Sequence, residues 1–284
     1  MIVLIPHSLE EALSLLDQNP KADILAGGTD IMVEMNYCHR RPEIVLSLRH
    51  VAELKCWQRF GDTLRIGASV NYSEIIKSEI ANLAPALTQA ARTVGSPQIR
   101  NTGTIGGNIA TASPAGDTLP VLVALNAVVH VKNIHREREI PISEFILGVK
   151  RNALEPGELI TAFSIPIVRG TQEFLKIGKR NAMVIAVANL ALNVDTKRKQ
   201  VACAIGSVGP TIIRCVDAEK FVMSKINWDN LGLPDAQDYV AFGKLCSKAA
   251  RPIDDHRSSA AYRSHAVSIM AQRALKRSIQ DRIL

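Results

Sequence analysis

Aromatic residues are scarce in this chain of 284 residues, of which Phe, Trp and Tyr make up only 4%. Proteins that bind single-stranded nucleic acid use such rings as platforms for base stacking. Basic residues outnumber acidic ones by 34 to 27, but they are spread in small groups, for example at residues 40–41 and 197–199. The few rings and the scattered charge therefore argue against a nucleic-acid partner, in spite of the net charge of +7.

Long apolar runs are also missing. None approaches the roughly 20 residues that cross a bilayer, and Asn189 and Asn193 interrupt the run at residues 184–194. The chain begins with a short apolar stretch that has no basic region ahead of it, unlike a secretory signal. With 47% apolar residues the chain can bury an ordinary core. We therefore expect a soluble, cytoplasmic protein without a membrane segment.

Metal-binding patterns are absent from the sequence as well. No two of the seven histidines stand four residues apart on a predicted helix, and we expect His265 to be a surface or packing residue. A catalytic or metal-binding role for Asp254, Asp255 and His256 is conceivable, but the position before a helix favours a capping turn. We expect mostly structural, reduced thiols and no metal site, because the cysteines are widely spaced and form no C-x-x-C pair: Cys38, Cys56, Cys203, Cys215 and Cys246.

The usual nucleotide-binding fingerprints are lacking too, since the chain has neither G-x-G-x-x-G nor G-x-x-x-x-G-K-[ST]. Two glycine pairs stand out instead. Residues 27–28 follow a predicted strand and precede a threonine and an aspartate, and residues 106–107 lie between a threonine and an asparagine. Glycine pairs let the backbone approach an anion closely. The first pair alone is typical of a tight turn in which Asp30 caps the next helix, whereas two such loops could hold the two phosphates of a dinucleotide.

The remaining pattern predicts an α+β fold, because strands and helices mix without regular β-α-β alternation. A capping box at Ser8 and Glu11 predicts the first helix. Apolar spacing predicts further strands at residues 24–26, 43–48, 63–70, 158–165 and 184–194, and helices at 83–94, 235–249 and 259–283. In the last of these helices the predicted inward side chains are Tyr262, Ala266, Ile269, Met270 and Ala274.

Two runs of sequence resemble one known family. ILAGGTDI (residues 24–31) and QIRNTGTIGGNIATASPAGDTLPVLVALNA (98–127) are similar to the two FAD pyrophosphate loops of the flavoprotein subunits of xanthine dehydrogenase and carbon monoxide dehydrogenase. LEPGELITAFSIP (154–166), FLKIGKR (174–180) and RPIDDHRSSAAYRSHAV (251–267) resemble the same family in the same order. The resemblance therefore covers nearly the whole chain.

This resemblance implies an FAD-binding domain of the vanillyl-alcohol oxidase (PCMH) type at residues 1–168, with subdomains at about 1–56 and 57–168. A smaller α+β domain of the carbon monoxide dehydrogenase flavoprotein type would follow at 171–284. The implied FAD-binding residues are Ile24, Leu25, Ala26, Gly27, Gly28, Thr29, Asp30, Ile31, Thr104, Ile105, Gly106, Gly107, Asn108, Asp117, Ile160 and Lys176. Two alternatives stay open: Asp117 could cap a helix, and Lys176 could be a solvated lysine at a strand end. No residue of this chain is implied as catalytic.

The implied function is electron transfer within a molybdenum hydroxylase. A large subunit with a molybdenum cofactor would oxidise the substrate, a small subunit with [2Fe-2S] clusters would pass electrons to FAD, and the assembly would be a dimer of heterotrimers. NAD, oxygen or another acceptor would receive the electrons. The implied substrates are purines first, then N-heteroaromatics, aldehydes and carbon monoxide. A stand-alone FAD-dependent oxidase and a non-catalytic scaffold are the alternatives.

The sequence departs from the family at three places. Val94 stands where vertebrate members have an aromatic residue near the flavin, and residues 181–184 lack the acidic side chains of relatives that reduce NAD. Both departures argue against NAD as the acceptor. The chain also lacks the four-cysteine insertion of members that carry a [4Fe-4S] cluster in this subunit.

Overall fold

The computed structural model describes residues 1–233 and 235–280, and its internal contacts divide the chain into two units. Unit 1 comprises Met1–Ile75, Ser96–Ala112 and Asn126–Pro166. Unit 2 comprises Ile76–Gly95, Ser113–Leu125 and Ile167–Leu284. The chain therefore passes between the units several times, whereas the resemblance implies one domain boundary near residue 168, which stays a prediction.

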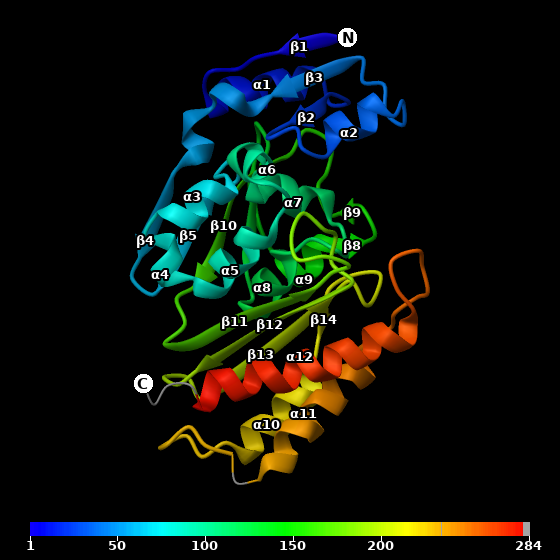
Figure 1. Cartoon of the computed structure of the whole chain (residues 1–284). Coiled ribbons are helices and arrows are strands. Elements are labelled where there is room, and N and C mark those ends of the chain that lie inside the picture. The colour runs from blue at the N-terminus through cyan, green and yellow to red at the C-terminus, as the bar shows by residue number, and fades with distance from the viewer. Residues whose placement is uncertain (234, 281–284) are drawn as a thin grey trace. The chain divides into compact units, whose positions relative to one another are not determined.

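Unit 1 contains two larger sheets and the two-stranded sheet β8-β9 (Figure 1). The first is parallel, in the order β1-β3-β2, and its elements with their helices are β1 (Ile2–Leu4), α1 (Leu9–Gln18), β2 (Asp23–Leu25), α2 (Ile31–Asn36), β3 (Ile44–Ser47), η1 (Leu48–His50) and η2 (Ala52–Lys55). The second is antiparallel, in the order β4-β5-β10-β6-β7: β4 (Trp57–Phe60), β5 (Thr63–Gly67), β6 (Val128–Lys132), β7 (Glu137–Pro141) and β10 (Leu159–Pro166). Shorter elements complete the unit: α6 (Pro97–Thr102), α7 (Ile105–Thr111), α9 (Ile142–Phe145), β8 (Ile146–Gly148) and β9 (Arg151–Asn152), while α3 (Tyr72–Lys77) spans the first unit boundary.

Helix α1 begins where the capping box predicts. The Ser8 hydroxyl accepts a hydrogen bond from the Glu11 N–H at 3.1 Å, and the Glu11 carboxylate accepts one from the His7 N–H at 2.8 Å. Leu13 and Leu16 then pack with β3 in one apolar cluster. The predicted strands of this unit are also present, although β5 ends at Gly67 instead of residue 70, because the chain turns there with the Val70 N–H bonded to the Gly67 carbonyl.

Unit 2 is a four-stranded antiparallel sheet with helices on both faces (Figure 1). Its strand order is β11-β12-β13-β14, formed by β11 (Gly170–Ile177), β12 (Ala188–Asp195), β13 (Gln200–Gly206) and β14 (Ile213–Arg214). Its helices are α4 (Ile80–Leu83), α5 (Pro85–Thr93), α8 (Leu119–Ala124), α10 (Val216–Lys225), α11 (Ala236–Ala249) and α12 (Ala260–Gln280). All eight residues of β12 are buried, because helices cover both of its faces.

Two predicted helices of unit 2 differ in detail from the structure. The predicted helix at 83–94 is interrupted at Ala84, because Pro85 starts the new helix α5. Gly95, with a φ of 47°, ends it as predicted. Among the described residues, no helix is both long and apolar enough to cross a membrane.

Helix α12 shows one wrong prediction. Ala266, Met270 and Ala274 are buried as expected, and Ile269 is half-buried, but Tyr262 is 50% exposed. Its neighbour Arg263 is buried instead, at 4% exposure, and His265 is exposed. Residues 281–283 of the predicted helix lie outside the described part of the chain.

Candidate cofactor-binding site

The first glycine loop leaves the end of β2 and leads into α2. Gly28 has a φ of 73°, a left-handed conformation that glycine adopts without steric cost. In the described part of the chain no group accepts a hydrogen bond from the backbone N–H of Gly28, Thr29 or Asp30. Asp30 occupies the N-cap position of α2, but its side chain makes no capping bond. The structure thus supports a loop of free donors and contradicts the interpretation of Asp30 as a side-chain cap.

The second glycine loop forms the start of α7, and its backbone donors are occupied. The Thr104 hydroxyl caps the helix by accepting the Gly107 N–H at 3.1 Å. The N–H groups of Ile105 and Gly106 bond to the carbonyls of residues 70 and 68, and the Asn108 N–H bonds to the Thr104 carbonyl. The two loops are therefore alike in sequence but differ in which donors remain free.

Unit 1 brings the two loops together, as the sequence predicts. A Cβ atom on Gly27 would collide with the carbonyl oxygen of Thr102 and would lie 2.8 Å from the Gly103 Cα. The Thr111 hydroxyl donates to the Asp30 carboxylate at 3.4 Å, which links residues 81 positions apart. The absence of a side chain at Gly27 is therefore what allows the two segments to touch.

Ile160 lies near the structure that supports the second loop. It is buried in β10 beside a bulge, after which the pairing with β6 shifts by one residue. The bulged Thr161 carbonyl accepts the Ala68 N–H at 3.0 Å, and the Ala68 carbonyl accepts the Gly106 N–H at 2.9 Å. A Cβ atom on Gly106 would lie 2.6 Å from the Cβ of Ala68, so this glycine is needed for close packing.

A cation near the first loop was not predicted from the sequence. Lys150, in the turn between β8 and β9, donates to the Glu34 carboxylate of α2 at 2.5 Å. This bond raises the pKa of Lys150 against the opposing effect of burial, and the charge of Asp30 raises it further. Lys150 therefore adds a positive charge near Asp30. The glycine pattern of the loops could not predict this contribution, because Lys150 lies in a hairpin far away in the sequence.

Asp117 and Lys176 form a buried ion pair within unit 2. Their charged atoms are 2.5 Å apart, and their side chains are only 6% and 8% exposed. Lys176 also donates to the Thr93 carbonyl, while Asp117 accepts hydrogen bonds from Thr93 and Asn189. Burial raises the pKa of Asp117, and the charge of Lys176 with these hydrogen bonds opposes that rise.

Both open alternatives for this pair are wrong. Lys176 is not a solvated lysine, because its ammonium group is enclosed by Asp117 and Thr93. Asp117 is not a helix cap, because Thr118 occupies the N-cap position of α8. Contact of Asp117, Ile160 or Lys176 with FAD stays a prediction.

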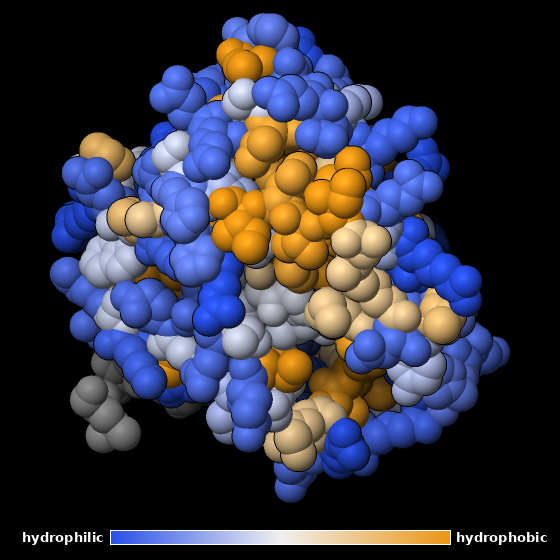
Figure 2. All heavy atoms as spheres, turned by 90° about the horizontal axis from the view of Figure 1, so that it is seen from above, coloured by the Kyte–Doolittle hydropathy of each residue, from blue (hydrophilic) through white to orange (hydrophobic). Residues whose placement is uncertain are grey.

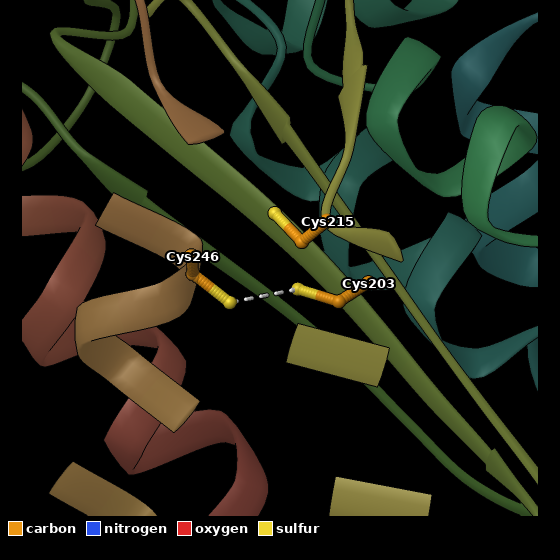
Figure 3. A group of neighbouring side chains, drawn as sticks. All are labelled: Cys203, Cys215 and Cys246. Atoms are coloured by element: carbon orange, nitrogen blue, oxygen red, sulfur yellow. Dashed lines mark hydrogen bonds between the residues drawn. The ribbon is translucent and has the colours of Figure 1, made fainter. Parts of the chain in front are cut away.

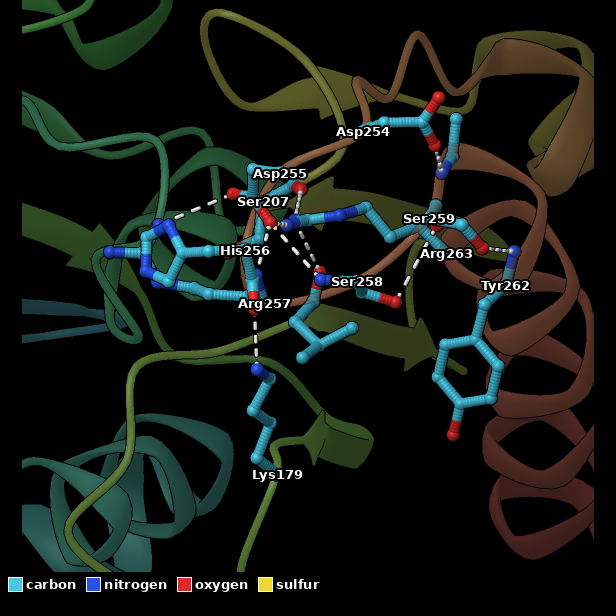
Figure 4. A network of polar contacts seen from close by, with 12 residues as sticks. Lys179, Ser207, Asp254, Asp255, His256, Arg257, Ser258, Ser259, Tyr262 and Arg263 are labelled. Atoms are coloured by element: carbon cyan, nitrogen blue, oxygen red, sulfur yellow. Dashed lines mark hydrogen bonds and ion pairs between the residues drawn. The ribbon is translucent and has the colours of Figure 1, made fainter.

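The segment before α12 is a capping turn, as the sequence favours (Figure 4). The Asp254 carboxylate accepts the Ala260 N–H at 2.5 Å, at the start of α12. Asp255 accepts the N–H groups of Arg257 and Ser258 and pairs with the Arg263 guanidinium at 2.7 Å. Both aspartates therefore have structural partners.

Arg263 connects this turn to the sheet of unit 2. Its guanidinium donates to the carbonyls of Val187 and Ser207 at 2.8 and 2.7 Å, next to β12 and β13 (Figure 4). These bonds explain why a charged residue is buried where the apolar pattern of α12 places Tyr262 inward.

Replacing Asp255 by asparagine should lower stability at neutral pH more than at acid pH. Burial would raise the pKa of Asp255, but bonds from the Arg257 and Ser258 N–H groups and from Arg263 outweigh it, so the folded-state pKa lies below its usual value. The unfolded state then binds more protons, and this stability is lost as the pH falls below about 4. The free energy of unfolding in urea, measured at pH 7 and at pH 2, should show the difference between wild type and Asp255→Asn becoming smaller at the lower pH; a constant difference would contradict this pH dependence.

Three cysteines that the sequence does not group together lie side by side in unit 2. The Sγ atoms of Cys203, Cys215 and Cys246 lie within 4.8 Å of one another, although the residues are 12 to 43 positions apart. Cysteine spacing could not predict this cluster, because the residues come from β13, the start of α10 and α11.

Comparison with known families gives two adjacent matches. The family described as "FAD binding domain in molybdopterin dehydrogenase" matches residues 1–168. The family described as "CO dehydrogenase flavoprotein C-terminal domain" matches residues 173–278. The first match contains both glycine loops.

Individual relatives agree with these matches. The chain is 31% identical to the glyceraldehyde dehydrogenase medium chain of Sulfolobus acidocaldarius, over 95% of both chains. It is 37% identical to the nicotinate dehydrogenase FAD-subunit of Eubacterium barkeri, over 67% of this chain and 68% of that protein. Among solved structures, a chain of carbon monoxide dehydrogenase from Hydrogenophaga pseudoflava matches with a TM-score of 0.89 and 27% identity, covering 98% of this chain and 96% of the other.

Proposed function

Because this chain belongs to the family of FAD-binding subunits of molybdopterin-dependent dehydrogenases, we propose that it is the electron-transfer subunit of such an enzyme. In this proposal it takes electrons from the [2Fe-2S] clusters of a small partner subunit. The molybdenum cofactor of a large partner subunit oxidises the substrate. FAD then passes the electrons to NAD, oxygen or another acceptor.

The observation that carries the proposal is the first glycine loop. The free N–H groups of Gly28, Thr29 and Asp30 are consecutive backbone donors, and such groups form a concave anion site. These three N–H groups have no hydrogen-bond acceptor among the described residues. A diphosphate supplies acceptor oxygens and negative charge. The loop therefore fits the diphosphate of FAD.

The second loop provides space for the cofactor, whereas the first provides hydrogen-bond donors. Apart from its chain neighbours and the backbone of α7, the one described atom that a Cβ on Gly107 would meet within 4 Å is Thr104 Oγ1, at 3.0 Å, so the space beyond this hydroxyl is open. Thr104 holds the start of α7 in place, and Ala68 holds Gly106. We infer that Gly27 and Gly106 bring backbone segments together, that Gly28 provides the left-handed turn of the first loop, and that Gly107 leaves room for the cofactor.

When bound, FAD accepts electrons one at a time and can release them in pairs. This chemistry suits a subunit placed between iron–sulfur clusters and a final acceptor. The residues of this chain bind and orient it. Lys150 adds positive charge near the first loop, and Thr29 and Asp30 offer a hydroxyl and a carboxylate suited to phosphate and to ribityl or ribose hydroxyls. No residue needs to act as an acid, base or nucleophile in this role.

An apolar surface supports assembly with other subunits. Apolar residues gather in the face that Figure 2 shows, and the edge strand β1 and its neighbour Ile5 expose large side chains, with Ile2 60%, Val3 45% and Ile5 49% exposed. Contiguous apolar areas on a protein surface mark contact sites. Two relatives are themselves described as a medium chain and an FAD-subunit.

The proposal is tested by purifying the chain alone and together with a molybdenum subunit and an iron–sulfur subunit. The chain alone should be yellow and should not oxidise substrate. In the anaerobic complex, xanthine, nicotinate, an aldehyde and carbon monoxide are each offered, and one of them should bleach the flavin absorbance. The bleaching should disappear when the iron–sulfur subunit is omitted.

The two alternatives give different results in the same experiment. A stand-alone oxidase would turn over substrate and reduce oxygen without partners. A scaffold would be colourless and would not take up added FAD. Either result would contradict the proposed function.

A further inference from the structure

The three clustered cysteines form a compact set of soft ligands in the core of unit 2. Cys203, Cys215 and Cys246 are 0%, 1% and 0% exposed, and their Sγ atoms lie within 4.8 Å of one another. Cys203 and Cys246 point toward each other with their sulfurs 3.9 Å apart (Figure 3). Three sulfurs at about 2.3 Å from one central ion lie about 4 Å apart, so the cluster has nearly the dimensions of a three-sulfur site.

The backbone holds these residues in place without a ligand. The Cys215 N–H donates to the Cys203 carbonyl at 2.9 Å, and the Cys203 N–H donates to the Glu219 carboxylate at 2.8 Å. Cys246 comes from α11, which packs against both α10 and α12. Binding an ion here would require little rearrangement, since all three thiols already converge.

Metal ligation requires the thiolate form of cysteine, so the thiol protons of the cluster pass to solvent when an ion binds.

We propose that Cys203, Cys215 and Cys246 bind one Cu(I) ion in a three-coordinate sulfur site. Thiolate sulfur selects soft ions such as Cu(I).

The number of ligands favours Cu(I) over Zn(II). Structural zinc is almost always four-coordinate, whereas among the described residues the group of converging ligand atoms has three members. The nearby Glu219 does not supply a fourth, because Arg214 occupies both of its carboxylate oxygens at 2.8 and 2.9 Å. Arg214 and Glu219 thus form a neutral pair beside the cluster.

The test uses the full chain in a Cys38→Ser/Cys56→Ser background, which removes the two exposed thiols. The reduced protein is titrated anaerobically with Cu(I) against a chromophoric Cu(I) chelator. The protein should bind one equivalent of Cu(I) so tightly that the chelator does not remove it. X-ray absorption should show about three sulfur neighbours of the copper at about 2.3 Å. Cys215→Ala should weaken binding by about 100-fold or more, since even changes outside the ligand set cost 10- to 100-fold.

Three results would overturn the proposal. The first is that the background protein does not compete with the chelator for Cu(I). The second is that a folded Cys215→Ala variant binds Cu(I) as tightly as the background protein. The third is that the protein binds Zn(II) in preference to Cu(I). If the variant fails to fold, the sulfur count around copper in the background protein decides alone, and a site with fewer than three sulfurs would contradict it. None of these readouts depends on FAD.

Discussion

Replacing Gly27 by alanine should weaken FAD binding by about 100-fold or more, which corresponds to about 2.7 kcal/mol. The added Cβ would collide with the carbonyl oxygen of Thr102, which is backbone and cannot turn aside. The first loop would have to move away from the second. FAD retained by the purified variant, and its affinity in a fluorescence titration, measure this effect.

Gly107→Ala tests the cofactor space with less disturbance of the fold. Its methyl group would meet only Thr104 Oγ1 at 3.0 Å, and alanine favours a helix over glycine by up to about 1 kcal/mol. The variant should therefore unfold at nearly the wild-type temperature and still bind FAD at least about tenfold more weakly, a loss of about 1.4 kcal/mol.

Gly148→Ala is the matched control in the same unit. A Cβ atom there would have ordinary contacts, at 3.9 Å or more from Arg151. This variant should bind FAD as wild type does. Full flavin content in both Gly27→Ala and Gly107→Ala would refute the assignment of the two loops.

Replacing Asp117 by alanine should destabilise the chain by about 3–5 kcal/mol, because it leaves the buried ammonium group of Lys176 without a counter-ion. Thr93 offers that ammonium only a carbonyl oxygen at 3.2 Å, which does not neutralise the charge. The difference is measured as the free energy of unfolding in urea at pH 7.

The double variant Asp117→Ala/Lys176→Met separates two contributions to this loss of stability: the unpaired buried charge and the lost packing. Removing both charges should recover much of the loss, because an apolar side chain no longer needs the counter-ion. The exposed pair Lys132–Glu137 is the control, and its disruption by Glu137→Gln should cost at most about 1 kcal/mol. Equal losses from Asp117→Ala and Glu137→Gln would contradict a structural role for the buried pair.

The glycine loops show what the sequence could predict about the site. Their local pattern identified two similar turns, and the structure confirms that they meet in unit 1. Sequence alone could not show that Ile105 and Gly106 give their N–H groups to residues 70 and 68, whereas Gly28 keeps its donor free. That difference arises from long-range backbone contacts.

Buried polar groups explain the main errors. Helix α12 has the predicted period, but Arg263 replaces Tyr262 on the inner face because its guanidinium has carbonyl and carboxylate partners there. The sequence left Lys176 either as an FAD contact implied by the resemblance or as a solvated lysine at a strand end, and neither interpretation predicts its ion pair with Asp117. A charged residue is conventionally expected at the surface, and only its partner Asp117, 59 residues away, makes burial favourable.

The cysteine cluster also could not be predicted from the sequence. Spacing motifs find metal ligands that lie close in sequence, such as C-x-x-C pairs. Cys203, Cys215 and Cys246 meet only because β13, α10 and α11 pack in one core. Such sets become visible once the fold is known.

The most direct test of the central claim is a titration of the apo-chain with FAD, FMN and ADP, followed by flavin fluorescence and by competition. One FAD should bind per chain, ADP should compete with it, and FMN should bind much more weakly because it lacks the diphosphate. A chain that binds no FAD, or that binds FMN as tightly as FAD, would contradict the account.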